Sequence, residues 1–243
     1  MILRYPSGAL ECGARTWLMG VLNVTPDSFS DGGKWIDPRR ALRHARAMVR
    51  DGADFIDVGG ESTRPGAKAV SSREELRRVL PVIEALAAGG IRVSVDTSKA
   101  AVAEAALRAG AVMVNDVTAL RGDRLMAPVA VRAGAAVVLM HMKGTPRTMQ
   151  RNPRYRDVIA EISGFFRRRM DFALRAGIAR DRILLDPGIG FGKLPEHNLE
   201  ILRRLDELCR LGRPLVLGTS RKNFIGRVLG RPPEDRVYGT AAT

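Results

Sequence analysis

The segment Asp51-Gly-Ala-Asp-Phe-Ile-Asp-Val-Gly59 shows the pattern that decides the fold of this chain. A glycine stands where a helical pattern ends, and the apolar run Phe55–Gly59 follows almost at once. Similar junctions precede further apolar runs at Ala109-Gly-Ala111, Ala133-Gly-Ala135 and Ala176-Gly-Ile178. Glycine commonly ends a helix and permits a tight turn into the next strand. The repetition therefore predicts a series of helix-to-strand units rather than two separate domains.

Short, nearly continuous apolar runs mark the predicted strands of this series. Runs of this kind are typical of strands buried on both faces, as in a parallel sheet covered by helices. The seven runs are Trp17–Val24, Phe55–Gly59, Val93–Asp96, Val112–Asp116, Val137–His141, Ile183–Asp186 and Leu215–Thr219. Amphipathic stretches between them predict helices. One such stretch begins with Ser72-x-x-Glu75, which is typical of a capping box at a helix N-terminus.

Repeated units of this length favour an α/β fold in which the strands close into a (β/α)₈ TIM barrel, with residues 1–243 as a single domain. An open, doubly wound sheet is the alternative. It has less support because no compact Gly-x-Gly-x-x-Gly turn follows the first run. With seven runs, the eighth strand and the last helix are missing from the sequence. We therefore expect an incomplete record of a longer protein, and the alternative is a truncated protein with an open barrel.

Composition restricts the class of protein. The chain is 45% hydrophobic, no run approaches the ~18 apolar residues of a membrane span, and no apolar signal segment opens it. The formal charge of +14 invites a nucleic-acid interpretation, but most arginines lie on the polar faces of predicted helices. Two cysteines, Cys12 and Cys209, do not suggest a disulfide framework. We expect a cytoplasmic protein that binds neither nucleic acid nor membranes.

Polar side chains stand at the carboxyl ends of nearly all the predicted strands. In a TIM barrel these ends line the active site. Any single residue there is as consistent with a turn or cap as with a function, but burying unpaired polar groups at so many strand ends is costly. We interpret the set as a site suited to a flat heterocycle with donor and acceptor edges. Its members are Asn23, Asp57, Asp96, Asn115 with Asp116, His141, Asp186, and Ser220 with Lys222.

Two loops, which follow the first and second predicted strands, indicate a polyanion site. Both hold more charged and hydroxyl side chains than a connecting turn needs. Arg64 can grip a phosphate through two hydrogen bonds, and Thr63 adds a hydroxyl donor. Asn23 and Asp31 offer oxygen atoms that suit Mg²⁺ held mainly by substrate phosphates. The loops are Asn23–Gly33 and Gly60–Gly66.

Seven segments, in order along nearly the whole chain, carry a family resemblance. They are Met19–Gly33, Asp57–Gly66, Ser94–Lys99, Val114–Asp116, Met140–Gln150, Asp186–Lys193 and Gly218–Lys222. Together they closely resemble the dihydropteroate synthase family, and the first two are highly specific. The resemblance implies a TIM barrel and a transferase of folate biosynthesis. Such an enzyme joins 4-aminobenzoate to (7,8-dihydropterin-6-yl)methyl diphosphate and gives 7,8-dihydropteroate and diphosphate.

The same resemblance implies roles for individual residues. The catalytic residues would be Asp96, Asp186, Lys222 and Arg64. The pterin would contact Asp96, Asn115, Asp186, Lys222 and Met140. The diphosphate would contact Asn23, Thr63 and Arg64, and 4-aminobenzoate would contact Phe29, Pro65, Phe191 and Ser220. Asn23 and Asp31 would help to place Mg²⁺, the expected cofactor. Sulfonamides compete with 4-aminobenzoate in this family. Its members are commonly dimeric, so we expect a homodimer.

The sequence departs from the family at two places. Asn223 stands where a small hydroxyl residue commonly follows the lysine. The Arg-x-His pair of the family's last strand, which would contact the pterin and the diphosphate, is not in this sequence. Two alternatives therefore stay open: a non-catalytic or truncated pterin-binding paralogue, and a pterin-dependent methyltransferase barrel. The methyltransferase would have no use for a diphosphate loop such as Ser62–Pro65.

Overall fold

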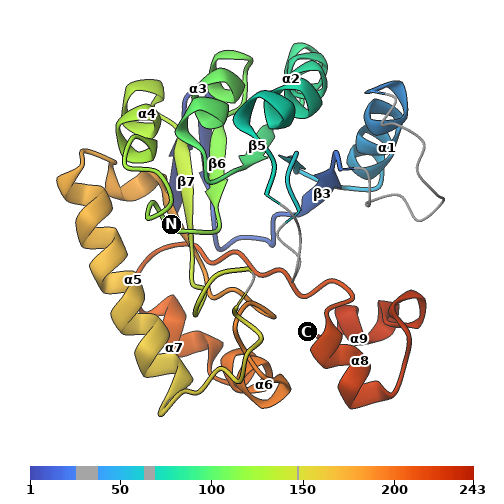
Figure 1. Ribbon diagram of the computed structural model, residues 1–243, viewed down its shortest axis with the longest axis vertical. Helices are drawn as coiled ribbons and strands as arrows, with labels where there is room; N and C mark the ends of the chain where they lie inside the picture. Colours follow the sequence, from blue (N-terminus) through green and yellow to red (C-terminus); the bar gives the residue numbers. More distant parts are fainter. Residues whose placement is uncertain (26–37, 63–68, 147) are drawn as a thin grey trace.

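A six-stranded parallel sheet forms the centre of the molecule. The computed structural model describes residues 1–25, 38–62, 69–146 and 148–243. In it the strands lie side by side in chain order from β3 to β8, and β1 and β2 form a separate antiparallel hairpin. The helices follow one another in an arc around the sheet (Figure 1). The α/β class and the parallel sheet that the sequence predicts are confirmed.

The helices and strands have the following bounds. The strands are β1 (Ile2–Tyr5), β2 (Gly8–Glu11), β3 (Met19–Asn23), β4 (Phe55–Gly59), β5 (Val93–Asp96), β6 (Met113–Asp116), β7 (Ala136–Met140) and β8 (Ile183–Asp186). The helices are α1 (Pro38–Arg50), α2 (Ser72–Ala88), α3 (Ala100–Arg108), α4 (Met126–Ala133), α5 (Val158–Arg175), α6 (Pro195–Arg203), α7 (Leu205–Cys209), α8 (Asn223–Leu229) and α9 (Val237–Ala241), with 3-10 helices η1 (Arg180–Arg182) and η2 (Pro233–Asp235). None of the helices in the described ranges is long and apolar enough to cross a membrane.

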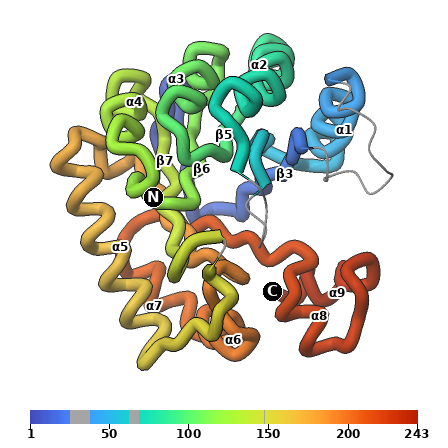
Figure 2. The backbone as a smooth tube through the Cα atoms, in the orientation of Figure 1, coloured from blue at the N-terminus to red at the C-terminus, as the bar shows by residue number. Residues whose placement is uncertain are grey.

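The strand order favours a barrel over a doubly wound sheet. In a doubly wound sheet the order of strands reverses at an internal switch point, where ligands bind. Here each strand from β3 to β8 pairs in parallel with its neighbour in the sequence. Figure 2 follows the same winding, from the blue first strands past β5, β6 and β7 to the red C-terminal helices. Continuous winding of this kind is the arrangement of a TIM barrel.

The prediction of a seventh strand over Leu215–Thr219 is wrong beyond its first residue. Leu215 pairs with Leu185 in an isolated parallel bridge. The amide of Leu185 donates to the carbonyl of Pro214 (3.0 Å), and the amide of Val216 donates to the carbonyl of Leu185 (2.9 Å). Among the described residues no strand lies on the other side of this stretch. Pairing along one edge leaves fewer ladder hydrogen bonds to hold the later residues extended.

Side chains alternate between the two faces of the sheet, as the period of a strand requires. In β4, Ile56 and Val58 are fully buried in the large hydrophobic cluster between the sheet and the helices. Phe55 belongs instead to a second cluster on the inner face. The other strands add Val93, Val95, Val114, Val137, Leu139, Ile183 and Leu185 to the outer cluster. The inner face is therefore a separate environment with its own neighbours.

The β1–β2 hairpin covers the amino end of the inner face. Leu3, Tyr5 and Leu10 pack there against inward side chains of the strands, which are Phe55, Met113, Ala136, Val138 and Leu184. The ring of Tyr5 meets that of Phe55 edge to face, with centroids 6.1 Å apart. The hairpin is not among the strands predicted from the sequence. Its apolar plug confines the polar inward residues to the carboxyl end of the sheet.

The start of helix α2 differs from the predicted capping box. Ser71 is the N-cap, and its hydroxyl accepts a hydrogen bond from the amide of Glu74 (3.3 Å). Glu75 does not serve the cap, because its side chain is fully buried and accepts from the ammonium of Lys99. Lys99 also contacts Glu61. The prediction was one residue out of register because two serines and two glutamates follow one another there.

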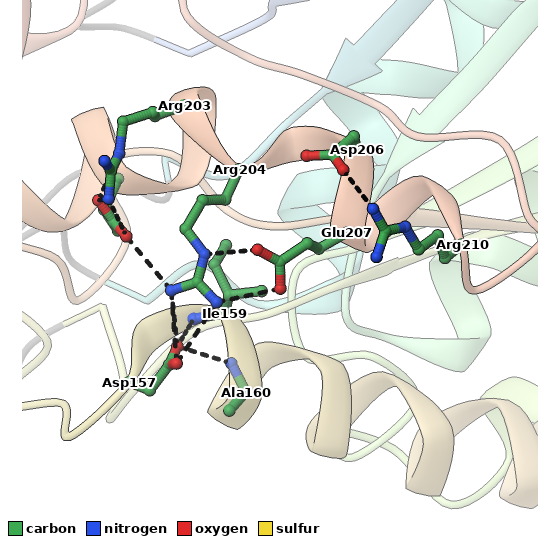
Figure 3. Close-up of polar contacts among 9 residues, drawn as sticks. Asp157, Ile159, Ala160, Arg203, Arg204, Asp206, Glu207 and Arg210 are labelled. Atoms are coloured by element: carbon green, nitrogen blue, oxygen red, sulfur yellow. Dashed lines mark hydrogen bonds and ion pairs between the residues drawn. The ribbon is translucent and has the colours of Figure 1, made fainter.

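A second ionic network fixes the start of helix α5. The carboxylate of Asp157 caps this helix by accepting from the amides of Ile159 (2.9 Å) and Ala160 (3.0 Å). The guanidinium of Arg204, at the junction of α6 and α7, donates to Asp157 and to Glu207 (Figure 3). Three helices are thereby joined at one point, and the segment that follows β7 has a fixed end.

We expect Lys99→Met to lower the free energy of unfolding by about 3 kcal/mol, because it leaves the buried carboxylate of Glu75 without its counter-charge. Urea titration would measure this change. Arg77→Met is the matched control, because it removes an exposed ion pair with Glu74 and should leave the urea midpoint close to that of the wild type. Equal effects of the two substitutions would contradict the assignment of a buried ion group.

Candidate active site

Four residues form a row across the carboxyl end of the sheet. The strand register pairs Asn23 with Gly59, Gly59 with Asp96, and Asp96 with Asn115. Neighbouring strands in a sheet lie about 5 Å apart, so the side chains of such a row share one surface. The structure thus brings together three of the residues that the sequence predicts for one site.

Gly59 leaves room between two oxygen-bearing side chains of this row. A methyl group placed on Gly59 would lie 3.5 Å from Oδ1 of Asn23 and 3.5 Å from Oδ2 of Asp96. Both oxygen atoms therefore border the same small space, and a larger side chain at this position would occupy it. A ligand or ion that enters this space meets an amide oxygen on one side and a carboxyl group on the other.

Asp57 lies one inward position below the row and orients Asn115. It is buried, with 3% of its surface exposed, and its Oδ2 accepts a hydrogen bond from Nδ2 of Asn115 (2.8 Å). The amide of Asn115 is therefore turned so that Oδ1 is its remaining acceptor. Neither this atom nor Oδ1 of Asp57 has a hydrogen-bond partner among the described residues. Buried acceptors without partners are uncommon, and a bound donor would satisfy them.

Asp96 lies in a strongly acidic environment. Burial raises its pKa well above the usual range, and the nearby carboxyl groups of Asp57, Glu75, Asp116 and Glu61 raise it further. Burial also raises the pKa of Asp57. Both effects disfavour the carboxylate form when no ligand is present. A ligand that offers hydrogen-bond donors or positive charge would relieve this cost, so the electrostatics of this part of the site favour such a ligand.

The ends of β7 and β8 and the start of α8 form the other half of the site. The register pairs Met140 with Asp186. Oδ1 of Asp186 accepts a hydrogen bond from the amide of Gly188 (2.6 Å). Nζ of Lys222 lies 4.5 Å from the centroid of the Phe191 ring, within the range of a cation–π contact. Phe191 also packs on the small apolar cluster that contains Met140. A carboxyl group, an ammonium group and an aromatic face therefore meet here.

Burial and charge oppose each other in this half. Burial raises the pKa of Asp186, although the amide of Gly188 and the ammonium groups of Lys222 and Lys193 act to lower it. Burial lowers the pKa of Lys222, although Asp186 acts to raise it. The charge of Asp57 raises the pKa of both Asp96 and Asp186. The two halves therefore belong to one electrostatic unit with Asp57 between them.

Several predicted residues are not placed by the structure. The structure places Asn23, all five predicted pterin contacts and Phe191 at the carboxyl end of the sheet. Ser220 is exposed in the stretch before α8. Phe29, Asp31, Thr63, Arg64 and Pro65 lie outside the described residues. Within the ranges that are described, no group of three or more His, Cys, Asp or Glu side chains is arranged to hold a metal ion.

Asp116 and His141, two members of the predicted ring, serve the fold. The carboxylate of Asp116 accepts from the amides of Thr118 and Leu120, both at 2.8 Å, and so closes the turn after β6. His141 is buried, and burial together with nearby positive charges lowers its pKa to about 2, so its ring is neutral. Its Nδ1 lies 3.1 Å from Nζ of Lys193. For Asp116 the turn-or-cap interpretation holds, whereas His141 contacts Lys193 next to the site.

Lys193 is a residue that the sequence interpretation did not single out. It is 3% exposed, and burial lowers its pKa to about 7, with Asp186 acting to raise the pKa and Lys222 to lower it further. The only available signal was its place at the end of the glycine-rich segment Asp186–Lys193. The group of Glu61, Lys99 and Glu75 was also missed, because nothing in the local pattern shows that a helical glutamate is buried.

Asp96→Asn is expected to stabilise the protein at neutral pH. Because the folded protein raises the pKa of Asp96 above 3.8, it binds this proton more tightly than the unfolded chain does. That contribution to stability is complete below pH 3.8 and is lost as the pH rises through the folded pKa. Asparagine does not ionise and avoids the loss. The Tm of the variant should exceed that of the wild type by roughly 2–4 °C for each ~1 kcal/mol gained in the free energy of unfolding. This difference in Tm should narrow toward pH 4.

Thermal unfolding at a series of pH values would test this expectation. Asp171→Asn on helix α5 is the matched control, because Asp171 is an exposed carboxylate paired with Arg175. The control should show no gap that changes with pH. A Tm difference for Asp96→Asn that stays constant from pH 4 to pH 8 would contradict a raised pKa at this residue.

Comparison with known proteins identifies the family. The model of the pterin-binding enzyme family matches residues 19–243. Dihydropteroate synthase from Synechocystis is 49% identical over 235 residues, which cover 96% of this chain and 81% of that protein. The dihydropteroate synthase of Yersinia pestis, solved with a sulfonamide drug, superposes with a TM-score of 0.94 at 47% identity and covers 100% of this chain and 88% of its own.

A third comparison concerns a product complex. The dihydropteroate synthase of Xanthomonas albilineans in complex with 7,8-dihydropteroate gives a TM-score of 0.88 at 43% identity, with coverage of 100% of this chain and 87% of the other. These matches confirm the TIM-barrel fold expected from the sequence. The chain belongs to the pterin-binding enzymes and, within them, to the dihydropteroate synthase family.

Proposed function

We propose that this chain condenses (7,8-dihydropterin-6-yl)methyl diphosphate with 4-aminobenzoate to give 7,8-dihydropteroate and diphosphate. A carbon–nitrogen bond forms between the methylene group and the arylamine. The carbon–oxygen bond to diphosphate breaks, its electron pair leaves with the diphosphate, and the amine loses one proton. The observation that carries this proposal is the meeting of Asp96, Asn115, Asp186 and Lys222 at the carboxyl end of one sheet in a member of this family.

The pterin ring would lie against the acidic part of the site. The aminopyrimidine edge of a pterin presents N–H donors, and the site presents acceptors on Asp96, Asn115 and Asp186. Asp57 fixes the amide of Asn115, and Gly188 fixes one oxygen of Asp186, so two of these acceptors are oriented in advance. Pre-oriented acceptors lose little entropy when the ring binds. Lys222 would donate to a ring nitrogen or carbonyl from the opposite half.

The same carboxyl groups would support the chemical step. Departure of diphosphate leaves positive charge on the pterin methylene, which the ring delocalises. Asp96 and Asp186 would stabilise that charge, because a positive neighbour favours the carboxylate form that burial disfavours. The arylamine then attacks an electrophile that already exists. No side chain of the protein needs to act as a nucleophile.

The diphosphate and 4-aminobenzoate would occupy the rim. We assign diphosphate binding to Asn23, Thr63 and Arg64, of which the structure describes Asn23. A guanidinium beside the departing oxygen would stabilise its growing negative charge. For 4-aminobenzoate we assign Phe29, Pro65, Phe191 and Ser220. The contact between Phe191 and Lys222 supports an aromatic pocket next to the pterin site.

Mg²⁺ is the proposed cofactor, with Asn23 and Asp31 as the residues that would help to hold it. Asn23, the member of this pair that the structure describes, fits the ion. Oδ1 of Asn23 borders the space above Gly59 together with the carboxyl group of Asp96, and Mg²⁺ prefers oxygen donors of this kind. Bound there, Mg²⁺ would supply positive charge that stabilises the leaving diphosphate.

We further propose that the protein works in the cytoplasm as a homodimer. Exposed apolar side chains on the last two helices support a contact with a second copy. They are Val228 and Leu229 on α8 and Val237 and Tyr238 on α9, each about half exposed or more. Burying such side chains against another chain would be favourable.

Asp186→Asn should weaken pterin binding about tenfold or more, which corresponds to ~1.4 kcal/mol, because it removes a charged acceptor. Calorimetry with a pterin diphosphate would measure the affinity, and a coupled assay would measure dihydropteroate formation by the 243-residue chain. Asp171→Asn is the control and should bind as the wild type does. If the wild-type chain binds the pterin but forms no dihydropteroate, the paralogue alternative is favoured.

A sulfonamide should compete with 4-aminobenzoate. The expected result is an apparent KM for 4-aminobenzoate that rises with sulfonamide concentration while kcat stays constant, because both molecules would occupy the pocket beside Phe191. Phe191→Ala should raise the KM for 4-aminobenzoate and weaken sulfonamide inhibition together. A loss of kcat at saturating 4-aminobenzoate would indicate that the drug binds elsewhere.

A further inference from the structure

The ammonium group of Lys193 lies buried directly behind the site. Lys193 follows β8 at the end of the glycine-rich loop 187–192, and 3% of its surface is exposed. None of the ion pairs between described residues involves it, and the partners of its Nζ are neutral acceptors instead. A buried lysine without a paired carboxylate is costly. The contacts of its Nζ offset part of that cost.

Those hydrogen bonds converge from two segments. Nζ donates to the carbonyl oxygens of Gly188 (3.0 Å) and Phe191 (3.0 Å), which belong to its own loop. It also lies 3.3 Å from the carbonyl oxygen of His141 and 3.1 Å from Nδ1 of the same residue, which follows β7. The side chain therefore crosses its own loop and ties it to the end of the neighbouring strand.

Other polar contacts hold the later part of this loop. Nε2 of Gln150 donates to the carbonyl of Gly190 (2.7 Å), the amide of Gly190 donates to Oδ1 of Asn198 (2.8 Å), and the hydroxyl of Tyr155 donates to the carbonyl of Gly192 (2.7 Å). Gly188, Gly190 and Gly192 all have positive φ, at 67°, 84° and 61°, in the left-handed region that favours glycine. Their backbone lies directly on the segment after β7, because a methyl group on Gly188 would lie 2.1 Å from the carbonyl oxygen of His141. Side chains cannot fill so close an approach. Polar cross-links therefore help to fix the loop, and those made by Nζ of Lys193 act on the carbonyl groups of Gly188 and Phe191.

The front of the same loop carries two groups of the site. The amide of Gly188 donates to Oδ1 of Asp186 (2.6 Å), and the ring of Phe191 lies beneath the ammonium of Lys222. Lys193 holds the carbonyl groups of these same two loop residues from behind. A shift of Gly188 would move Asp186 relative to the pterin, and a shift of Phe191 would move its ring relative to 4-aminobenzoate.

We propose that Lys193 is a positioning residue for both substrate pockets, which acts by cross-linking the loop 187–192 to His141. The inference rests on the proposed function, since the pockets are those assigned above. It does not make Lys193 a catalytic residue, because the hydrogen-bond partners of its Nζ are backbone carbonyls and the ring of His141. Its effect on substrates passes through Gly188 and Phe191.

Lys193→Met tests this role, because methionine fills a similar volume and donates no hydrogen bond. We expect the KM for 4-aminobenzoate and the Kd for a pterin diphosphate each to rise about tenfold, as when a hydrogen bond to a charged group is lost. A purely structural role would lower the amount of active enzyme, and hence the apparent kcat, without changing KM or Kd. Arg175→Met is the control, since Arg175 pairs with Asp171 on the exposed side of α5 and should leave both constants unchanged.

A double-mutant cycle with Phe191→Ala tests whether the effect of Lys193 on the KM for 4-aminobenzoate depends on the side chain of Phe191. If Lys193 acts through Phe191, Lys193→Met should raise the KM for 4-aminobenzoate tenfold in the wild-type background but less than about twofold when Phe191 is already alanine. Full additivity of the two changes would overturn the proposal. So would a Lys193→Met enzyme that has wild-type KM and Kd.

Two further outcomes are distinguishable. If Lys193→Met shows no cooperative thermal unfolding, the same cycle is run with Lys193→Gln, which keeps two donors and should give a smaller effect of the same kind. If the wild-type chain forms no dihydropteroate, the proposed function fails, and calorimetry with the pterin still tests Lys193 through its effect on Asp186. Unchanged pterin affinity in both variants would then overturn the inference by itself.

Discussion

A carboxyl group inside a parallel sheet loses its hydration, and this cost governs where the inner face can be polar. At the amino end of the strands the inner face is apolar, and the β1–β2 hairpin seals it with Leu3, Tyr5 and Leu10. At the carboxyl end, loops and helix starts offer amide donors and cations that can compensate the cost, as Gly188 and Lys222 do for Asp186. Such donors and cations favour the placement of acids toward this end of the strands.

These donors and cations offset only part of the cost of burying the carboxyl groups. A ligand can offset the rest by supplying hydrogen-bond donors or positive charge. Asp57, Asp96 and Asp186 all have raised pKa values, and buried acceptors on Asp57 and Asn115 have no partner among the described residues. A fold optimised for stability alone would replace such groups. Retaining these groups lowers the stability of the ligand-free protein and raises its affinity for ligands rich in hydrogen-bond donors. The buried carboxyl group of Glu75, which pairs with Lys99, adds to this cost by raising the pKa of Asp96 further.

The sequence was informative where a pattern is local and periodic. The apolar runs predicted six strands of the sheet, and their terminal residues predicted the row from Asn23 to Asn115. The sequence was uninformative where strand pairing or the burial of a side chain depends on a segment remote in the chain. Leu215–Thr219 has the composition of a strand but pairs along one edge, and the hairpin exists because Phe55 and its neighbours need a cover. Neither the burial of Glu75 nor the contacts of Lys193 can be inferred from adjacent residues, because both depend on segments remote in the chain.

The net charge of the chain and the charge of its inner face act on one ligand in opposite directions. A formal charge of +14 attracts anions to the molecule, whereas the acids around Asp96 repel an anion that enters the barrel. A pterin diphosphate would satisfy both conditions in one orientation, with its ring against the acids and its diphosphate toward the mouth. The bond that must break then lies at the boundary between the two regions. Its cleavage would leave positive charge beside the carboxyl groups and send negative charge outward, so the field that orients the substrate would also favour the reaction.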